Sequence, residues 1–154
     1  MYLVESGALM NRFIAALSAA VERGVDVYLL FDDFGARGLR GADRQHIKHA
    51  GIQLVMYNPT HYGELRRSLF RDHRKLLVVD GDAAFVGGMG LSDDFDVSVH
   101  PKNYWHDTAV RVRGPVVADW HTVFRRNWRY WSRQELPAFS VQSAGVVHEN
   151  EAFD

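Results

Sequence analysis

The sequence contains no cysteine among its 154 residues. This absence excludes a disulfide framework, a zinc site with thiolate ligands and a catalytic cysteine, although it does not by itself fix the compartment. No stretch approaches the roughly 18 consecutive apolar residues that a membrane-spanning helix needs. The first residues also lack a basic stretch followed by an apolar run and a cleavage site. The sequence therefore predicts neither a transmembrane helix nor a secretion signal.

Lysine is scarce and the net charge is low. Only three of the 18 basic residues are lysine, and the formal net charge is -1. A chain with this balance lacks the strongly basic character of a dedicated nucleic-acid-binding protein. The last 21 residues hold four acidic and no basic residues, so the rest of the chain carries a small positive excess that attracts anions weakly.

Segments typical of helices alternate with segments typical of strands. Apolar side chains recur at helical spacing over residues 6–23, and the nearly continuous apolar run over residues 25–31 predicts a buried strand. The pattern repeats as a helix over residues 39–50 and a strand over residues 52–57. This order predicts an α/β protein.

The pattern in the second part of the chain predicts two strands that run antiparallel to each other. Apolar runs over residues 75–79 and 83–86 flank Asp80-Gly81-Asp82, which has the composition of a tight hairpin turn. A strand over residues 107–112 and a helix over residues 114–131 follow. The expected fold is a mixed β-sheet flanked by helices.

Composition predicts one domain with a tail. Only residues 1–4 can form a strand before the first helix, which is short for the opening of a packed sheet. Residues 134–154 are polar with little periodicity, as in a linker or a frayed terminus. We therefore expect a single domain over residues 1–133.

A basic cluster precedes the strand that begins at residue 75. His73 and Lys75 lie two positions apart, so both side chains project from the same face of an extended chain. A neutral imidazole is a nucleophile, and an adjacent ammonium favours the neutral form and binds phosphate oxygen. Arg71 and Arg74 of the same cluster are expected to gather anionic headgroups or a nucleic-acid backbone. The cluster predicts a site for an anionic phosphoester.

The residues that follow complete a longer motif. His73, Lys75, Asp80, Gly87 and Gly88 have the spacing His-x-Lys, four residues, Asp, six residues, Gly-Gly. This pattern resembles the signature of the phospholipase D superfamily, except that glycine at position 90 stands where the family usually has asparagine. Over roughly residues 5–131 the chain is similar to the N-terminal half of bacterial cardiolipin synthases, with matching segments ERGVDVYLLFDDFG, AGIQLVMYNP and WHDTAVRVRGPVVADW.

The resemblance implies a two-step phosphoryl transfer without a metal or other cofactor. One histidine attacks the phosphorus of a phosphodiester, and a histidine from a second motif protonates the leaving alcohol. By its position in the motif, His73 is one of this pair. The resemblance further implies that Lys75 binds the phosphate and that Asp107 orients the histidine. Asp80 supports the fold near the site, and its place in a turn gives it a structural reason to be aspartate. The amides of the paired glycines, Gly87 and Gly88, are expected to approach the phosphate.

The chain contains a single His-x-Lys motif, whereas the chemistry needs two histidines. The second half is expected either from an identical chain across a twofold axis or from the missing C-terminal half of a longer protein. The expected substrate is an anionic phospholipid such as phosphatidylglycerol, and the expected location is cytoplasmic, with peripheral contact to the inner membrane. Two alternatives stay open: a homodimeric, metal-independent nuclease, and an inactive fragment that binds anionic lipid.

Three other features have structural explanations that outweigh functional ones. His46 and His49 fit an exposed helix face better than a metal site. The acidic residues after Ser92 fit a capped helix start better than a calcium loop. Aromatic side chains recur at helical spacing in the last helix and are expected to pack on the sheet, although neighbouring arginines can also contact an anionic bilayer: Trp120, Phe124, Trp128 and Trp131.

Overall fold

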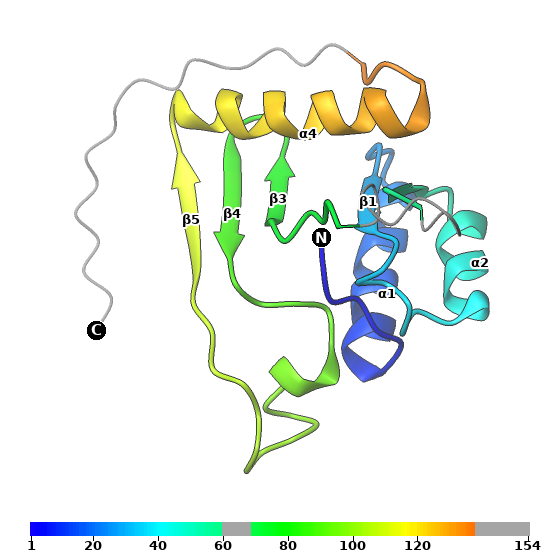
Figure 1. Ribbon diagram of the computed structural model, residues 1–154, viewed down its shortest axis with the longest axis vertical. Coiled ribbons are helices and arrows are strands. Elements are labelled where there is room, and N and C mark those ends of the chain that lie inside the picture. Colours follow the sequence, from blue (N-terminus) through cyan, green and yellow to red (C-terminus); the bar gives the residue numbers. More distant parts are fainter. Residues whose placement is uncertain (60–68, 138–154) are drawn as a thin grey trace.

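The computed structural model describes residues 1–59 and 69–137 and has the expected α/β organisation. Helices and strands follow one another as anticipated along the chain (Figure 1). The elements are α1 (Ala8–Glu22), β1 (Tyr28–Asp32), α2 (Gly41–His49), β2 (Gln53–Tyr57), β3 (Lys75–Val79), β4 (Ala83–Gly87), the 3-10 helix η1 (Asp93–Phe95), β5 (Ala109–Arg113) and α4 (Val116–Ser132).

The strands form two groups of different direction. β1 and β2 are parallel, whereas β3, β4 and β5 form an antiparallel meander in that order. Both directions are therefore present as expected, but within the described ranges they occur in two sheets instead of one continuous mixed sheet. The edge of β1 that β2 leaves open is bonded to Met1, whose amine donates to the Leu30 carbonyl at 2.6 Å and whose carbonyl accepts from the Asp32 amide at 2.8 Å.

Helix α4 lies across both sheets (Figure 1). Its Trp128 is 1% exposed and meets Tyr28 of β1 edge-on at a centroid distance of 5.2 Å. Trp131 contacts Tyr57 of β2 at 5.1 Å. The other two aromatic residues of the predicted stripe are half-buried. Trp128 and Trp131 of the aromatic stripe therefore pack against the strands, as the helical spacing predicted.

A hydrophobic core lies between α1, α2 and the parallel sheet. It is built from apolar side chains that are nearly free of solvent contact: Met10, Ile14, Phe31, Ile47, Ile52 and Leu91. Leu91 belongs to this core although it follows β4, because its backbone forms an isolated parallel bridge with Val4. The N-terminal segment therefore connects the region after β4 to the parallel sheet.

The acidic segment after β4 has the structural role that its sequence indicated. Ser92 caps η1 by accepting from the Asp94 amide at 3.4 Å. The Asp93 carboxylate also accepts from the amides of Ala8 and Leu9, at 3.0 and 2.8 Å, at the N-terminus of α1. An anion there is stabilised by the unpaired amides and by the helix dipole.

The last described residues follow α4 without regular structure. Residues 134–137 form no regular element, yet Leu136 is only 5% exposed. The remainder of the predicted tail, residues 138–154, lies outside the described residues. The boundary at residue 133 stays a prediction.

Candidate functional site

Strand pairing brings the motif residues to one end of the antiparallel sheet. Lys75 of β3 pairs with Gly87 of β4, which pairs in turn with Ala109 of β5. Continuing this register by two residues aligns His73 and Asp107 on either side of the chain that leaves β4. Lys75 begins β3, and His73 and Asp107 lie two residues before β3 and β5, so the backbone of all three belongs to the same end of the antiparallel sheet.

Asp107 is fixed beside the glycine pair by backbone hydrogen bonds. Its Oδ1 accepts from the Gly88 amide at 3.1 Å and from the Thr108 amide at 2.7 Å. Asp107 and His73 are both exposed, and the described residues show no direct hydrogen bond between them. Because both amides bind Oδ1, Oδ2 keeps its capacity to accept a further donor.

The paired glycines allow β5 to approach β4 closely. A Cβ atom at Gly87 would lie 2.6 Å from the Thr108 carbonyl oxygen, and one at Gly88 would collide with the Asp107 carboxylate. This crowding explains why both positions lack a side chain. Their predicted contact with a phosphate group stays a prediction.

His73 and Lys75 differ in their surroundings. The His73 imidazole stacks on the ring of Tyr2, with centroids 3.8 Å apart and ring planes 17° from parallel. Lys75 is half-buried, and among the residues with described positions it forms no ion pair. Tyr2 is absent from the sequence-based site because no local pattern reports a contact between such distant positions.

The segment before His73 is anchored by a buried carboxylate. Asp32 is 0% exposed and its Oδ2 accepts from the Asp72 amide at 3.0 Å. Arg71 lies with its Nη1 at 3.6 Å from Asp32 Oδ1 and donates to the Asn58 carbonyl at 2.9 Å. Buried charges need such partners, because isolated they lose their hydration without compensation. Arg71 therefore stabilises the approach to His73, and its phosphate-binding role stays a prediction.

Arg74 is paired with the carboxylate of Asp72. Its Nε and Nη2 donate to the two carboxylate oxygens at 2.7 and 3.0 Å, the fork geometry that suits arginine. Burial acts to raise the pKa of Asp72, but the hydrogen bonds from Arg74 outweigh it and hold the pKa below its usual value. Binding of phosphate by Arg74 also stays a prediction, while Arg66 and Arg67 lie outside the described residues.

Asp80 lies apart from this group. It occupies the β3–β4 turn with a positive φ of 51°, so the length of β3 separates it from His73. At about 3.3 Å per residue the strand places it about 16 Å from Lys75. The turn gives this position a structural reason to be aspartate, and its support of the fold near the site stays a prediction.

Gly90 has no room for the asparagine that the family pattern has at this position. The residue is buried, and an added Cβ atom would lie 2.8 Å from the Leu3 carbonyl oxygen. The same carbonyl accepts from the Leu91 amide at 2.9 Å, which draws the two segments together. The departure from the family pattern therefore coincides with close packing of the N-terminal segment.

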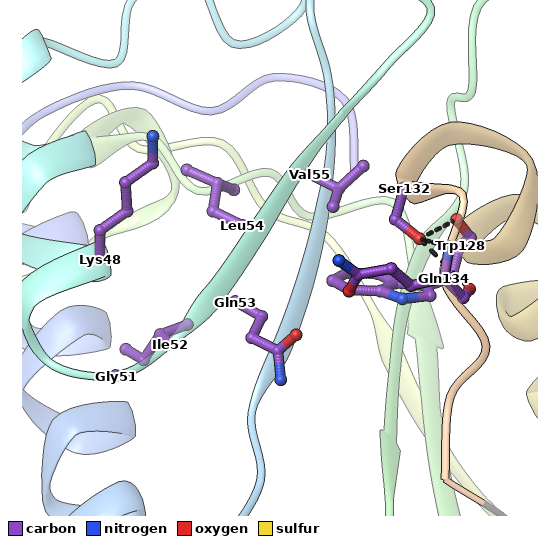
Figure 2. Close-up of a pocket in the computed structure, with 9 residues that line it drawn as sticks. All are labelled: Lys48, Gly51, Ile52, Gln53, Leu54, Val55, Trp128, Ser132 and Gln134. Carbon is purple, nitrogen blue, oxygen red and sulfur yellow. Dashed lines mark hydrogen bonds between the residues drawn. The ribbon is translucent and has the colours of Figure 1, made fainter.

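A pocket on the described surface lies away from the motif residues. This open pocket is lined by β2 and the end of α4, with Gln53, Trp128, Ser132 and Gln134 among its side chains (Figure 2). It contains none of the motif residues. His46 and His49 are exposed on α2, and over the described ranges no three histidine or acidic side chains converge as metal ligands. Within the same ranges no helix is long and apolar enough to cross a membrane.

Comparison of the sequence with known proteins identifies relatives of this chain. The family model described as "Cardiolipin synthase, PLD-like domain" matches residues 1–128. The chain is 32% identical over 137 residues to the probable cardiolipin synthase YwiE of Bacillus subtilis, covering 88% of this chain and 27% of that protein. It is 36% identical over 138 residues to cardiolipin synthase A of Pseudomonas fluorescens Pf-5, covering 88% of this chain and 28% of that protein.

A third relative extends the match along the chain. Cardiolipin synthase of Oceanobacillus iheyensis is 32% identical over 151 residues, which cover 95% of this chain and 31% of that protein. The chain thus spans less than a third of the length of these relatives. Since the family model covers most of the chain, including His73, Lys75 and Asp107, the chain belongs to the phospholipase D-like domain family of cardiolipin synthases.

Proposed function

We propose that this chain supplies the first half of a phosphatidyltransferase that acts on phosphatidylglycerol through a phosphohistidine. The proposal is carried by the position of His73, Lys75 and Asp107 at the same end of the β3–β5 sheet, where Asp107 binds the Gly88 amide. A nucleophile, a cation and an orienting carboxylate are the groups that a metal-independent attack on a phosphodiester needs.

In the first step the imidazole of His73 attacks the phosphorus of phosphatidylglycerol. The bond from phosphorus to the glycerol oxygen breaks, and the second histidine gives that oxygen a proton. In the second step the hydroxyl of an acceptor attacks the phosphohistidine and returns its proton to the second histidine. A second phosphatidylglycerol as acceptor yields cardiolipin, whereas water yields phosphatidic acid.

Two further side chains support this chemistry. The Lys75 ammonium has no carboxylate partner among the described residues, so it can pair with a non-bridging phosphate oxygen without first breaking an ion pair. Asp107 Oδ2 can accept from one imidazole nitrogen, which fixes the tautomer and leaves the other nitrogen to attack. Arg71 and Arg74 hold the segment that carries His73.

The second His-Lys set must come from another half, either an identical chain or the C-terminal part of a longer protein. Lys75, Leu77 and Val79 alternate along β3 and therefore share one face of the sheet. Leu77 and Val79 are 46% and 41% exposed, and Phe85, which pairs with Leu77, is 36% exposed. This apolar surface adjoining Lys75 is one that a second half can cover.

The test is turnover of phosphatidylglycerol in vesicles by the chain, with its solution mass measured by light scattering at the same concentration. A dimer that forms cardiolipin, with activity abolished in His73→Ala and retained in the exposed control His49→Ala, supports the proposal. Turnover that survives His73→Ala would refute it. Plasmid cleavage in chelator without lipid turnover would favour the nuclease, and a monomer that binds anionic vesicles without turnover would favour an inactive fragment.

A further inference from the structure

The N-terminal segment contributes an aromatic ring to the site. The Tyr2 ring and the His73 imidazole are stacked face to face, 3.8 Å apart and 17° from parallel. The same ring abuts Gly35, where an added Cβ atom would lie 2.7 Å from Tyr2 Cδ2. The tyrosine ring is thus packed against both the imidazole and the backbone that follows β1.

The position of Tyr2 is set by backbone hydrogen bonds on both of its sides. The Met1 carbonyl accepts from the Asp32 amide at 2.8 Å, and the Val4 amide donates to the Gly35 carbonyl at 2.9 Å. The Leu3 carbonyl accepts from the Leu91 amide at 2.9 Å. These bonds do not involve His73, so the backbone that carries the tyrosine is held independently of the imidazole, and the tyrosine ring abuts Gly35.

We infer that Tyr2 is a positioning residue that fixes the plane of the His73 imidazole before substrate binds. The inference rests on the proposed role of His73 as a reacting group. An exposed histidine samples several side-chain rotamers, whereas attack on phosphorus needs one orientation. A stacked aromatic partner favours that orientation beyond the effect of simple burial. Stacking uses the ring alone, so we expect phenylalanine to replace the tyrosine.

The first test is the NMR spectrum of the imidazole in Tyr2→Phe and Tyr2→Leu. The His73 ring-proton resonances are assigned by their disappearance in His73→Ala. The ring current of a stacked aromatic shifts them upfield, so they stay in place in Tyr2→Phe and move downfield in Tyr2→Leu. The control Tyr130→Leu removes an exposed tyrosine whose recorded ring contacts are with Trp131 and Arg133, and it leaves them unmoved. Identical His73 resonances in Tyr2→Leu and the wild type would overturn the inference.

The second test is steady-state turnover of phosphatidylglycerol by the same variants. We expect Tyr2→Leu to lower kcat by about 2- to 12-fold, the factor by which one aromatic pair favours the stacked orientation, with KM unchanged. Tyr2→Phe should restore the wild-type rate. A raised KM with unchanged kcat contradicts positioning. Failure of the proposed function is distinct, since it appears as turnover that survives His73→Ala, and the NMR test needs no turnover.

A second variant covers the case in which Tyr2→Leu fails to fold. Gly35→Ala leaves both rings in the sequence but adds a Cβ atom where the Tyr2 ring lies. Displacement of the ring should move the His73 resonances and lower kcat in the same direction as Tyr2→Leu. A folded Gly35→Ala protein, judged by circular dichroism, with wild-type His73 resonances would refute the inference.

Discussion

Asp32 is the buried charge on which the approach to the site depends. Its carboxylate accepts from the amides of Phe34, Gly35 and Asp72 at 3.0, 3.1 and 3.0 Å. The guanidinium of Arg71, whose side chain is 10% exposed, lies 3.6 Å away. Replacing Asp32 with alanine therefore removes the acceptor of three amides and the counter-charge of a nearly buried cation.

These contacts set bounds on how much stability the Asp32→Ala variant loses. A hydrogen bond to a charged group contributes about 1.5–3 kcal/mol, and removing one partner of a buried pair costs about 3–5 kcal/mol. The contributions share one carboxylate and do not add, so we expect Asp32→Ala to lower the free energy of unfolding by about 3–5 kcal/mol. Asp32→Asn keeps the shape and one acceptor oxygen, so its loss should be about 1–3 kcal/mol.

Urea unfolding followed by tryptophan fluorescence measures both losses. The matched control is Asp82→Ala, which removes an exposed ion pair with Arg113 at 2.8 Å. The side chain of Asp82 is 42% exposed and that of Arg113 is 59% exposed. Such surface pairs contribute at most about 1 kcal/mol. If Asp32→Ala is no less stable than Asp82→Ala, the carboxylate does not hold this network together and the reasoning is wrong.

Three other predictions concern Gly90, Asp107 and the Asp72–Arg74 pair. Gly90→Asn should lower stability by about 1–3 kcal/mol, because its side chain meets the Leu3 backbone, and an unchanged Tm would contradict that crowding. Asp107→Asn should lower kcat by about 10²- to 10⁴-fold with little effect on Tm, and an equal rate would remove Asp107 from the site. The pKa of Asp72 is lowered on folding, so its contribution is present above the unfolded pKa near 3.8 and is lost as pH falls through the lower folded value. Arg74→Gln should therefore flatten the acid side of the stability–pH profile, and an unchanged slope would exclude this pair as its source.

The helices and strands could be predicted from the sequence where the residues of one segment determine its structure. β3 begins and ends where the apolar run does, because a turn of fitting composition separates it from its partner. β1 begins at Tyr28, later than expected at residue 25, because residues 23–25 close α1: the Gly24 amide donates to the Val21 carbonyl and the Val25 amide to that of Ala20. β5 begins at Ala109, after Asp107 has turned its carboxylate onto backbone amides.

Contacts between distant segments could not be predicted in this way. Local spacing drew attention to His73 and Lys75, and the resemblance to the phospholipase D superfamily placed the orienting carboxylate at Asp107, where a later strand was expected to begin. Tyr2 could not be found in this way because its stacking on His73 depends on the course of the N-terminal segment along the open edge of β1. The division of the strands into two sheets likewise depends on which edges meet, and a strand's own pattern does not specify its neighbours.

The supports of His73 all come from within this chain. Asp32 holds the preceding residue, Tyr2 covers the imidazole, and Asp107 is fixed by the Gly88 amide. We therefore expect the proposed nucleophile to be ordered without a second half, whereas the proposed chemistry needs a second half to protonate the leaving alcohol. General acid catalysis contributes about 10²- to 10⁴-fold to such a step. Assembly of the two halves should consequently raise the rate of phosphohistidine formation by about that factor while leaving the His73 resonances nearly unchanged, and a large movement of those resonances on assembly would show that the site is not preformed.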